Sequence, residues 1–191
     1  MNTAVMIYGR FQPVTVGHVK MFENYNTVIK KEKSYGYIFI SPKVDHKDNP
    51  LSLDTRYNFL HKLYSDINFV ADSEIKNPFD AVHFLGGRGY SKIILIAGSD
   101  QSGRLQQQLS KYIHNPDPEK SFLNVDQIEV STFGNKRNHD SKDFIESVSA
   151  TKARKAAKDK DFLLFCEIIP DCSFEEKVQL FDDVRRGMEL N

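Results

Sequence analysis

The sequence feature that most constrains the fold is the alternation of short apolar segments with longer segments of helical periodicity. Apolar, β-branched and aromatic residues predict strands over residues 4–8, 35–41, 67–71, 92–97 and 126–132. Helical spacing and helix-start signals predict helices over residues 17–32, 52–65, 78–85 and 102–113, followed by helices from about Ser149 and Ser173. Because strands alternate with helices, we expect an α/β fold with a mostly parallel five-stranded sheet and right-handed crossovers.

Length and composition fit one domain over residues 1–191, which includes the C-terminal helices from about residue 149. Lysine plus arginine equals aspartate plus glutamate, 26 each, so no overall field would attract nucleic acid or an anionic membrane. Cys166 and Cys172 match no common zinc spacing or disulfide framework, which favours the reducing cytoplasm. The sequence offers no recognisable signal peptide and no stretch long enough to span a bilayer.

Residues 9–21, GRFQPVTVGHVKM, connect the first predicted strand to the first predicted helix. A strand that breaks at glycine and turns into a helix start directs backbone N–H groups and the helix dipole at whatever binds there, which favours phosphates. His18 would lie at the mouth of this helix, and Thr15 can reach the same space. In parallel sheets ligands bind beyond the carboxyl ends of the strands, so we expect residues 9–18, 41–50 and 98–101 to meet there.

The segment GRFQPVTVGH resembles the (H/T)xGH signature of the nucleotidyltransferase superfamily. TxGH is the form known in phosphopantetheine adenylyltransferases, and GRFQP is similar to nicotinamide-mononucleotide adenylyltransferases. The resemblance implies a Rossmann-like three-layer fold, in which His18 and Thr15 hold a triphosphate and stabilise the leaving pyrophosphate. The nucleotide-binding residues that it implies in this motif are Gly9, Arg10, Phe11, Gly17 and His18.

A second cluster follows the second predicted strand, where residues 41–56 read SPKVDHKDNPLSLDTR. Prolines exclude regular structure at its start, so Lys43 lies in a loop, and Arg56 follows in the next helix. The segment resembles the lysine-containing loop and NPxSxxxR of several adenylyltransferases and of phage-type nucleotidyltransferases. That resemblance implies that Lys43 and Arg56 bind a phosphorylated acceptor and that Lys43 bridges to the α-phosphate. The alternative is a solvated lysine loop, with Arg56 in a surface ion pair.

Gly98 and Asp100 follow the strand at residues 92–97, which has the continuous apolar character of a central strand. Gly98 would allow the chain to pass close to a ligand, and Asp100 can accept from a base amine or a sugar hydroxyl. The pair resembles the Gly-x-Asp segment of the same superfamily. The alternative role of Asp100, as a cap for the next helix, is compatible with ligand contact.

The third cluster is SVSATKAR at residues 147–154, which resembles the ISSTxxR motif with Val148 for isoleucine and Ala150 for the second serine. A capped helix start with hydroxyls and two cations suits a triphosphate, whereas the alternative is an ordinary capped helix with a basic exposed face. The nucleotide-binding residues that the resemblance implies here are Ser149, Thr151, Lys152 and Arg154.

The reaction implied is transfer of a nucleoside monophosphate from an NTP to a phosphorylated small molecule, with release of pyrophosphate. His18, Thr15, Lys43 and Arg154 would carry catalysis by alignment and charge neutralisation, and Mg²⁺ would be bound mainly through the NTP phosphates. Gln12 stands where cytidylyltransferases tend to have aspartate, which favours ATP. The alternatives are a cytidylyltransferase acting on a sugar- or polyol-phosphate and a nucleotide-binding module without catalysis. The apolar stripe of the final helix would dock on the core or, as an alternative, form a homo-oligomer contact.

Overall fold

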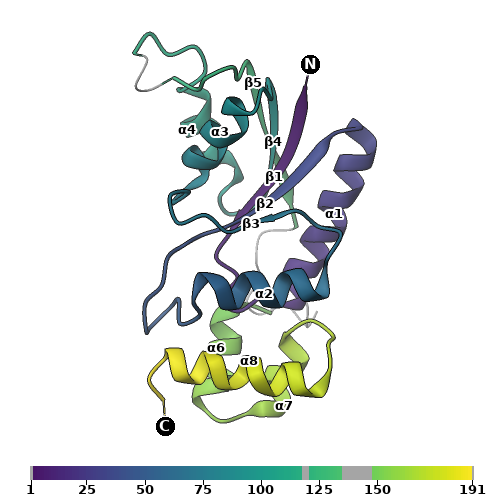
Figure 1. Ribbon diagram of the computed structural model, residues 1–191, viewed down its shortest axis with the longest axis vertical. Helices are drawn as coiled ribbons and strands as arrows, with labels where there is room; N and C mark the ends of the chain where they lie inside the picture. Colours follow the sequence, from purple (N-terminus) through teal and green to yellow (C-terminus); the bar gives the residue numbers. More distant parts are fainter. Residues whose placement is uncertain (1, 118–120, 135–147, 191) are drawn as a thin grey trace.

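The sheet has five strands, all parallel, in the order β3-β2-β1-β4-β5 (Figure 1). The computed structural model describes residues 2–117, 121–134 and 148–190. The strands are β1 (Thr3–Gly9), β2 (Tyr35–Ile40), β3 (Phe69–Val70), β4 (Lys92–Gly98) and β5 (Gln127–Phe133). The strand order reverses between β1 and β4, which is the point where ligands bind in open α/β sheets.

Seven helices lie in the described part of the chain. They are α1 (Val16–Glu32), α2 (Leu53–Leu63), α3 (Pro78–Gly87), α4 (Ser102–Ser110), α6 (Ala150–Lys158), α7 (Phe162–Ile168) and α8 (Phe174–Gly187). One face of the sheet is covered by α1 and α2 and the other by α3 and α4, which makes three layers. The last three helices pack together beyond the carboxyl ends of the strands (Figure 1).

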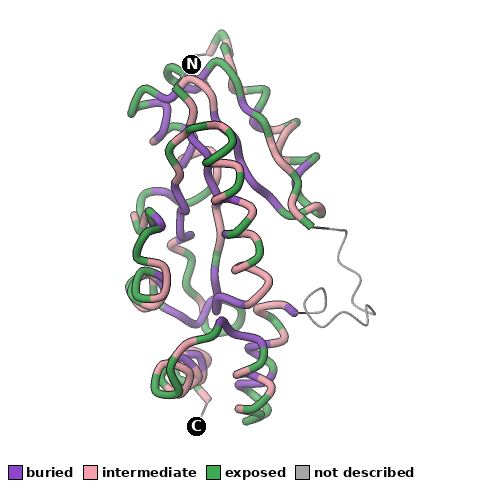
Figure 2. The backbone as a smooth tube through the Cα atoms, turned by 90° about the vertical axis from the view of Figure 1, so that its right-hand side faces the viewer, coloured by how far each residue is buried: buried purple, intermediate pink, exposed green. Residues whose placement is uncertain are grey.

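The alternation of side chains along β1 builds a core on each face of the sheet. Val5 and Ile7 pack toward α1 and α2, whereas Ala4 and Met6 pack toward α3 and α4, and all four are buried. This is the period of two that a strand imposes. Figure 2 shows the buried backbone running through the middle of the molecule, with exposed residues on the outer helices. The sheet is therefore packed on both faces, and the carboxyl ends of its strands can carry a binding site.

A third cluster of buried residues joins the C-terminal helices to the loop before α2. Leu51 packs with Val148, Phe165 and Leu180 in this cluster. Gly187, at the end of α8, lies so close to the backbone oxygen of Pro50 that an added Cβ would be 2.0 Å from it. The final helix therefore docks on the rest of the chain, as expected. A homo-oligomer contact stays a prediction.

The sequence-based prediction of the elements is confirmed in its main lines, with local differences. The strand expected at 67–71 is the two residues Phe69 and Val70, and α3 continues through Gly87 instead of ending before it. Helix α7 was not separated from its neighbours in the sequence. Most of the residues between the fifth predicted strand and the helix from about Ser149 lie outside the described residues. No described helix is long and apolar enough to cross a membrane.

Candidate active site

The loop after β1 is shaped by a residue in the left-handed region. Phe11 has φ 49°, is 1% exposed, and turns its ring back over Gly9. A Cβ at Gly9 would lie 2.5 Å from this ring, so only glycine fits there. The peptide bond between Gln12 and Pro13 is cis. Gly9 and Phe11 thus form the turn that leads the chain from β1 to the start of α1.

Thr15 caps helix α1, and the imidazole of His18 completes that cap. The backbone N–H of Thr15 donates to Nδ1 of His18 over 3.0 Å, and Oγ1 of Thr15 lies 3.0 Å from the same nitrogen. Since Nδ1 accepts, the neutral ring carries its hydrogen on Nε2. Phe11 holds the ring edge-to-face with the centroids 5.1 Å apart. His18 therefore presents a donor at the helix mouth, and the half-buried Gly17 lies in the same first turn.

Gln12 joins this loop to the loop after β2. Its Nε2 donates to the oxygen of Leu51 over 2.8 Å, and its Oε1 accepts from the nitrogen of Leu51 over 2.8 Å. A longer bond of 3.4 Å reaches the oxygen of Lys43. Because both the donor and the acceptor of this buried side-chain amide bond to backbone atoms, Gln12 is a positioning residue. Its place in the motif was visible in the sequence, but its partner, 39 residues away, was not.

Arg56 is buried, which excludes the alternative of a surface ion pair. Nη1 donates to the oxygens of Arg10 and Ser41, each over 2.7 Å, and Nε donates to the oxygen of Ser52 over 3.1 Å. The side chain is not in a surface ion pair, because it is 2% exposed. Burial lowers the pKa of this guanidinium to about 10, and the nearby Tyr8 opposes that shift. Arg56 therefore joins the ends of β1 and β2, and its expected contact with an acceptor stays a prediction.

The loop between β2 and α2 contains a tight turn at residues 45–49, organised by Asp45. Its Oδ1 accepts from the backbone nitrogens of Lys47, Asp48 and Asn49 over 2.6 to 3.2 Å, and its Oδ2 accepts from the side-chain amide of Asn49. These bonds, the one to Asp48 above all, lower the pKa of Asp45 to about 2. His46 extends from the turn to the oxygen of Gly187 over 3.0 Å. The turn is thus a defined structure that holds Asp48 in place.

The start of α6 has the capped geometry expected for residues 149–154. Oγ of Ser149 accepts from the backbone nitrogen of Lys152 over 3.1 Å. Oγ1 of Thr151 accepts from Nη2 of Arg154 over 3.2 Å. The side chain of Thr151 therefore orients Arg154 and the hydroxyl of Ser149 closes the helix, while Lys152 is half-buried in the same turn. Ser147 of this segment lies outside the described residues.

Arg154 brings the two motifs together. Its Nη1 donates to the oxygen of Gln12 over 2.8 Å, and its Nη2 lies 3.2 Å from Oδ1 of Asp48. Arg154 is 8% exposed, and burial lowers the pKa of its guanidinium. Asp48 opposes that shift, whereas the positive charge of Arg10 adds to it. Two arginines that repel each other at a helix start make a place where an anion is stabilised. Asp48 carried no signal in the sequence, because the loop around it has charges of both signs.

The remaining predicted residues lie at the same edge of the sheet but make fewer contacts. Lys43 and Arg10 are exposed, and no hydrogen bond or ion pair to a described residue occupies the ammonium of Lys43. Gly98 is the last residue of β4 and Asp100 follows it, and both are also exposed. An added Cβ at Gly98 would meet nothing within 4 Å, so the protein itself leaves space there. Among the described residues, no hydrogen bond or ring contact joins Gly98 or Asp100 to the loop after β1.

Two other features bear on what the site can do. The described residues include no group of three or more His, Cys, Asp or Glu side chains that could hold a metal ion.

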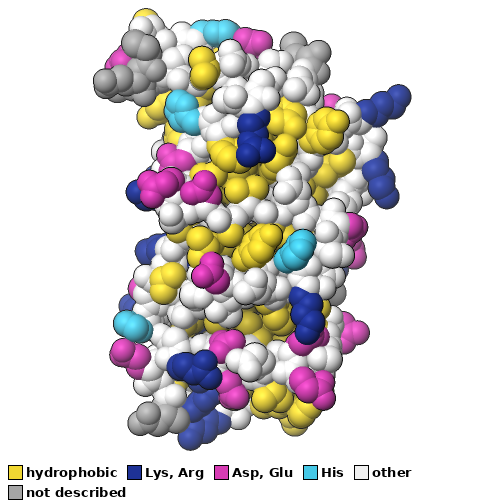
Figure 3. Space-filling model, viewed as in Figure 1, with side chains coloured by type: hydrophobic (Ala, Val, Ile, Leu, Met, Phe, Trp, Pro, Cys, Tyr) yellow, Lys and Arg dark blue, Asp and Glu magenta, His cyan; other side chains and the backbone are white. Residues whose placement is uncertain are grey.

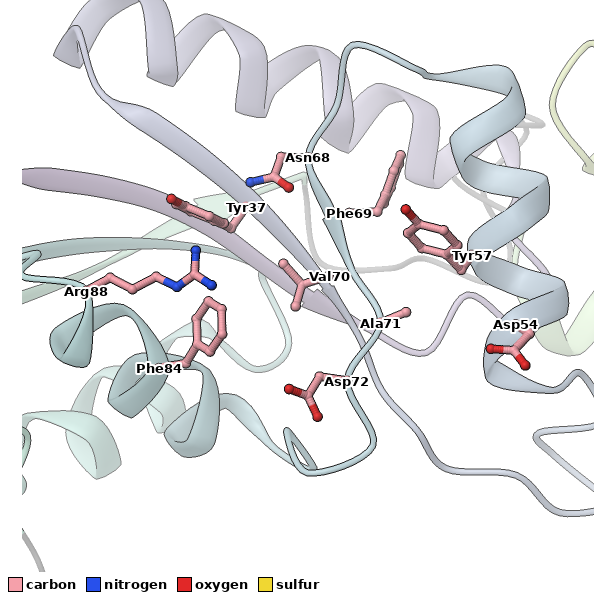
Figure 4. A pocket seen from close by; sticks show the side chains of 10 residues that line it. All are labelled: Tyr37, Asp54, Tyr57, Asn68, Phe69, Val70, Ala71, Asp72, Phe84 and Arg88. Atoms are coloured by element: carbon pink, nitrogen blue, oxygen red, sulfur yellow. The ribbon is translucent and has the colours of Figure 1, made fainter.

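A groove of about 500 Å³ lies at the outer edge of the sheet, between α2 and α3 (Figure 4). Hydrophobic side chains gather on this face of the molecule (Figure 3). Tyr37, Val70 and Phe84 line the groove with Arg88, whose guanidinium lies 4.1 Å from the Phe84 ring centre. None of the predicted site residues lines it.

Comparisons with known proteins agree with this architecture. The model of the cytidylyltransferase-like family matches residues 6–156. No curated protein sequence matches the chain. Among solved structures, nicotinic acid mononucleotide adenylyltransferase of Plasmodium falciparum, complexed with NaAD, is similar with a TM-score of 0.63 and 13% identity, over 100% of this chain and 99% of that one.

Two further structures are similar over only part of their own length. A bifunctional NMN adenylyltransferase/ADP ribose pyrophosphatase from Francisella tularensis, complexed with AMP and a manganese ion, has a TM-score of 0.58 and 13% identity, over 99% of this chain and 52% of that one. TmcAL of Thermotoga maritima, bound with alpha-thio ATP, has a TM-score of 0.55 and 12% identity, over 99% of this chain and 56% of that one. At these identities the likeness establishes the Rossmann-like fold.

Proposed function

The chain belongs to the cytidylyltransferase-like family of nucleotidyltransferases, and from this premise we propose that it transfers a nucleoside monophosphate from an NTP to a phosphorylated small molecule. The observation that carries the proposal is the contact of Arg154 with the Gln12 backbone, because it brings the capped start of α6 to the loop that leads into α1. Two helix N-termini with His18, Arg10 and Arg154 around them suit the charge of a triphosphate.

In the proposed reaction an ionised phosphate oxygen of the acceptor attacks the α-phosphorus of the NTP in line. The bond from the α-phosphorus to the bridging oxygen breaks, and pyrophosphate leaves. A phosphate needs no general base at pH 7, so the protein aligns the partners and neutralises developing charge. Nε2–H of His18 donates to the departing phosphates, and Thr15 keeps that ring in place through Nδ1.

The cations divide between the two substrates. Arg154, Arg10 and Lys152 lie on the side of the two helix starts and would bind the triphosphate. Lys43 lies in the loop after β2, with an exposed ammonium, and would bridge the α-phosphate and the acceptor. Ser149 and Thr151 support this arrangement through the cap and through Arg154. Gly98 and Asp100 would contact the base or the ribose.

Magnesium would arrive bound to the phosphate oxygens of the NTP. The described residues include no group of three or more side chains that could hold a metal ion, so the NTP phosphates and water would carry it. Mg²⁺ retains several waters in such sites and neutralises charge on the departing pyrophosphate.

AMP is the proposed group in preference to CMP. The similar structures named above are of proteins complexed with NaAD, AMP or alpha-thio ATP, which supports adenine. The alternative is CMP transfer to a sugar- or polyol-phosphate, which the family description supports. Gln12, the residue behind the preference inferred from the sequence, binds Leu51, so its side chain is not proposed as a contact of the base.

The direct test is incubation of the purified protein with one NTP at a time and a panel of phosphorylated acceptors, with pyrophosphate release and product mass as readouts. Formation of an acceptor–nucleotide product together with stoichiometric pyrophosphate is the expected result. Tight binding of ATP or CTP without turnover on any acceptor would favour the alternative of a nucleotide-binding module.

A further inference from the structure

Asp48 places a carboxylate on the guanidinium that is proposed to bind the triphosphate. Its Oδ1 lies 3.2 Å from Nη2 of Arg154, while Nη1 is held by the Gln12 oxygen. Nη2 also donates to Thr151. A phosphate oxygen that reaches Nη2 must therefore share it with Asp48 or displace Asp48. Since two anions cannot both take the same donor without repelling each other, the two compete.

The position of Asp48 makes displacement feasible. The side chain of Asp48 is 51% exposed, whereas that of Arg154 is 10% exposed, so the carboxylate can return to water while the guanidinium stays. The singly charged, half-exposed Asp48 carboxylate binds Arg154 weakly. A triphosphate with Mg²⁺ would also bond to the helix starts and to His18. The triphosphate is therefore the stronger of the two ligands.

Asp48 lies in the 45–49 turn, and the other contacts of this turn do not depend on Arg154. Asp45 holds the turn together internally, His46 binds it to the oxygen of Gly187, and Asn49 is fully buried. The contact with Arg154 attaches the Asp48 carboxylate to α6. When that contact is lost, the carboxylate can turn to solvent while the turn stays in place.

We propose that Asp48 is an internal anion that competes with the NTP triphosphate for Arg154, so that nucleotide binding releases the Asp48 carboxylate from this guanidinium. This makes Asp48 a residue that lowers nucleotide affinity. The inference rests on the proposed function, because it takes Arg154 as a triphosphate ligand.

The test measures binding of inorganic tripolyphosphate with Mg²⁺ by calorimetry, so that neither the base nor turnover enters. Asp48→Asn, which keeps the shape and removes the charge, is expected to bind on the order of threefold to tenfold more tightly than wild type. Asp48→Ala is the second variant, and Asp54→Asn, an exposed carboxylate on α2, is the matched control that is expected to change nothing.

A double-mutant cycle separates competition for Arg154 from simple repulsion. In an Arg154→Ala background, Asp48→Asn is expected to have no effect on tripolyphosphate binding, because the shared donor is gone. Equal tightening in both backgrounds would overturn the inference, since the carboxylate would then repel phosphate by itself. The backbone amide signals of Lys47 and Asn49 in NMR spectra are expected to shift with tripolyphosphate in wild type and little in Asp48→Asn.

The outcomes also separate this inference from the proposed function. If wild type transfers nucleotide and Asp48→Asn binds tripolyphosphate as wild type does, the competition is wrong and the function stands. If wild type binds neither tripolyphosphate nor an NTP, the proposed function is wrong, and the role of Asp48 fails with it.

Discussion

Arg154 donates a hydrogen bond to the backbone oxygen of Gln12 over 2.8 Å, although 142 residues separate the two in the chain. Through this bond the start of α6 is placed against the loop that leads into α1. Each helix start alone is an ordinary capped N-terminus. Together they bring cations and backbone donors close to one another. The role of each group in binding or catalysis can be tested by substitution.

Arg154→Ala is expected to weaken NTP binding by on the order of tenfold or more, and Arg154→Lys by less, because lysine keeps the charge but cannot hold Gln12 and a phosphate at once. Calorimetric titration with ATP measures this. Lys155→Ala is the control, since Lys155 lies on the same helix but pairs with Asp159 on its exposed face. ATP binding to Arg154→Ala with wild-type affinity would contradict the assignment.

His18 is predicted to serve the helix cap with Nδ1 and the phosphates with Nε2. His18→Asn keeps an acceptor for the Thr15 N–H, so it is expected to preserve the unfolding midpoint. Both His18→Asn and His18→Ala are expected to lower turnover on the order of 10²-fold. His18→Gln, whose amide reaches toward the Nε2 position, is expected to recover part of the turnover. Steady-state kinetics with thermal unfolding on each variant decides this. A folded His18→Ala within a few-fold of wild-type turnover would remove His18 from the mechanism.

Lys43 is predicted to act on the acceptor side. Lys43→Ala is expected to lower turnover or acceptor affinity while the Kd for ATP stays near that of wild type, because Lys43 lies in the loop after β2 and not at the helix starts. Titrations of NTP and acceptor in parallel distinguish the two effects. Lys30→Ala, an exposed lysine at the far end of α1, serves as control. The division of roles fails if Lys43→Ala and Arg154→Ala have the same kinetic defects.

Gln12 is predicted to stabilise the fold. Gln12→Ala leaves the nitrogen and oxygen of Leu51 buried without partners, which costs about 1–3 kcal/mol in the free energy of unfolding. Gln12→Glu loses the donor and buries a carboxylate against the Leu51 oxygen, so it is expected to be at least as destabilising as Gln12→Ala. Urea unfolding measures both, with the exposed Gln107→Ala as control. Wild-type stability of Gln12→Ala would show that the amide is not needed to hold the loop.

Base choice is predicted to favour ATP strongly over CTP. A polar site built for one Watson–Crick edge leaves buried groups unpaired when the wrong base binds. Competition between equal concentrations of ATP and CTP, read by the mass of the product, measures the ratio. Predominant CMP transfer would overturn the adenylyl assignment and leave the family membership unchanged.

The parts of the fold that the sequence predicts well are those encoded by neighbouring residues. Helices were expected to start at residue 52 and at about Ser149 and Ser173, and the side chain of each of these serines accepts from a nitrogen three residues later. Helix α7 was not predicted as a separate helix, because its seven residues, FLLFCEI, form a short apolar run with no clear helical period.

The site could be predicted as a set of motifs but not as a set of contacts. Arg56 was expected to meet an acceptor or a surface acid, because an arginine in a polar segment normally faces solvent. Its actual partners include backbone oxygens 46 and 15 residues away. The ion pair of Arg154 with Asp48 spans 106 residues. Such pairings depend on where the sheet places its loops, which no local pattern specifies.

The close approach of Gly187 to Pro50 has a consequence for reading natural variation in this chain. A side chain at position 187 would press on the backbone that follows the 45–49 turn, because no space for a Cβ exists there. In genetic terms, a substitution near the C-terminus would then have the phenotype of a substitution in the loop between β2 and α2. Position 187 is therefore best grouped with Asp48 and Lys43 when variants of this family member are sorted by effect.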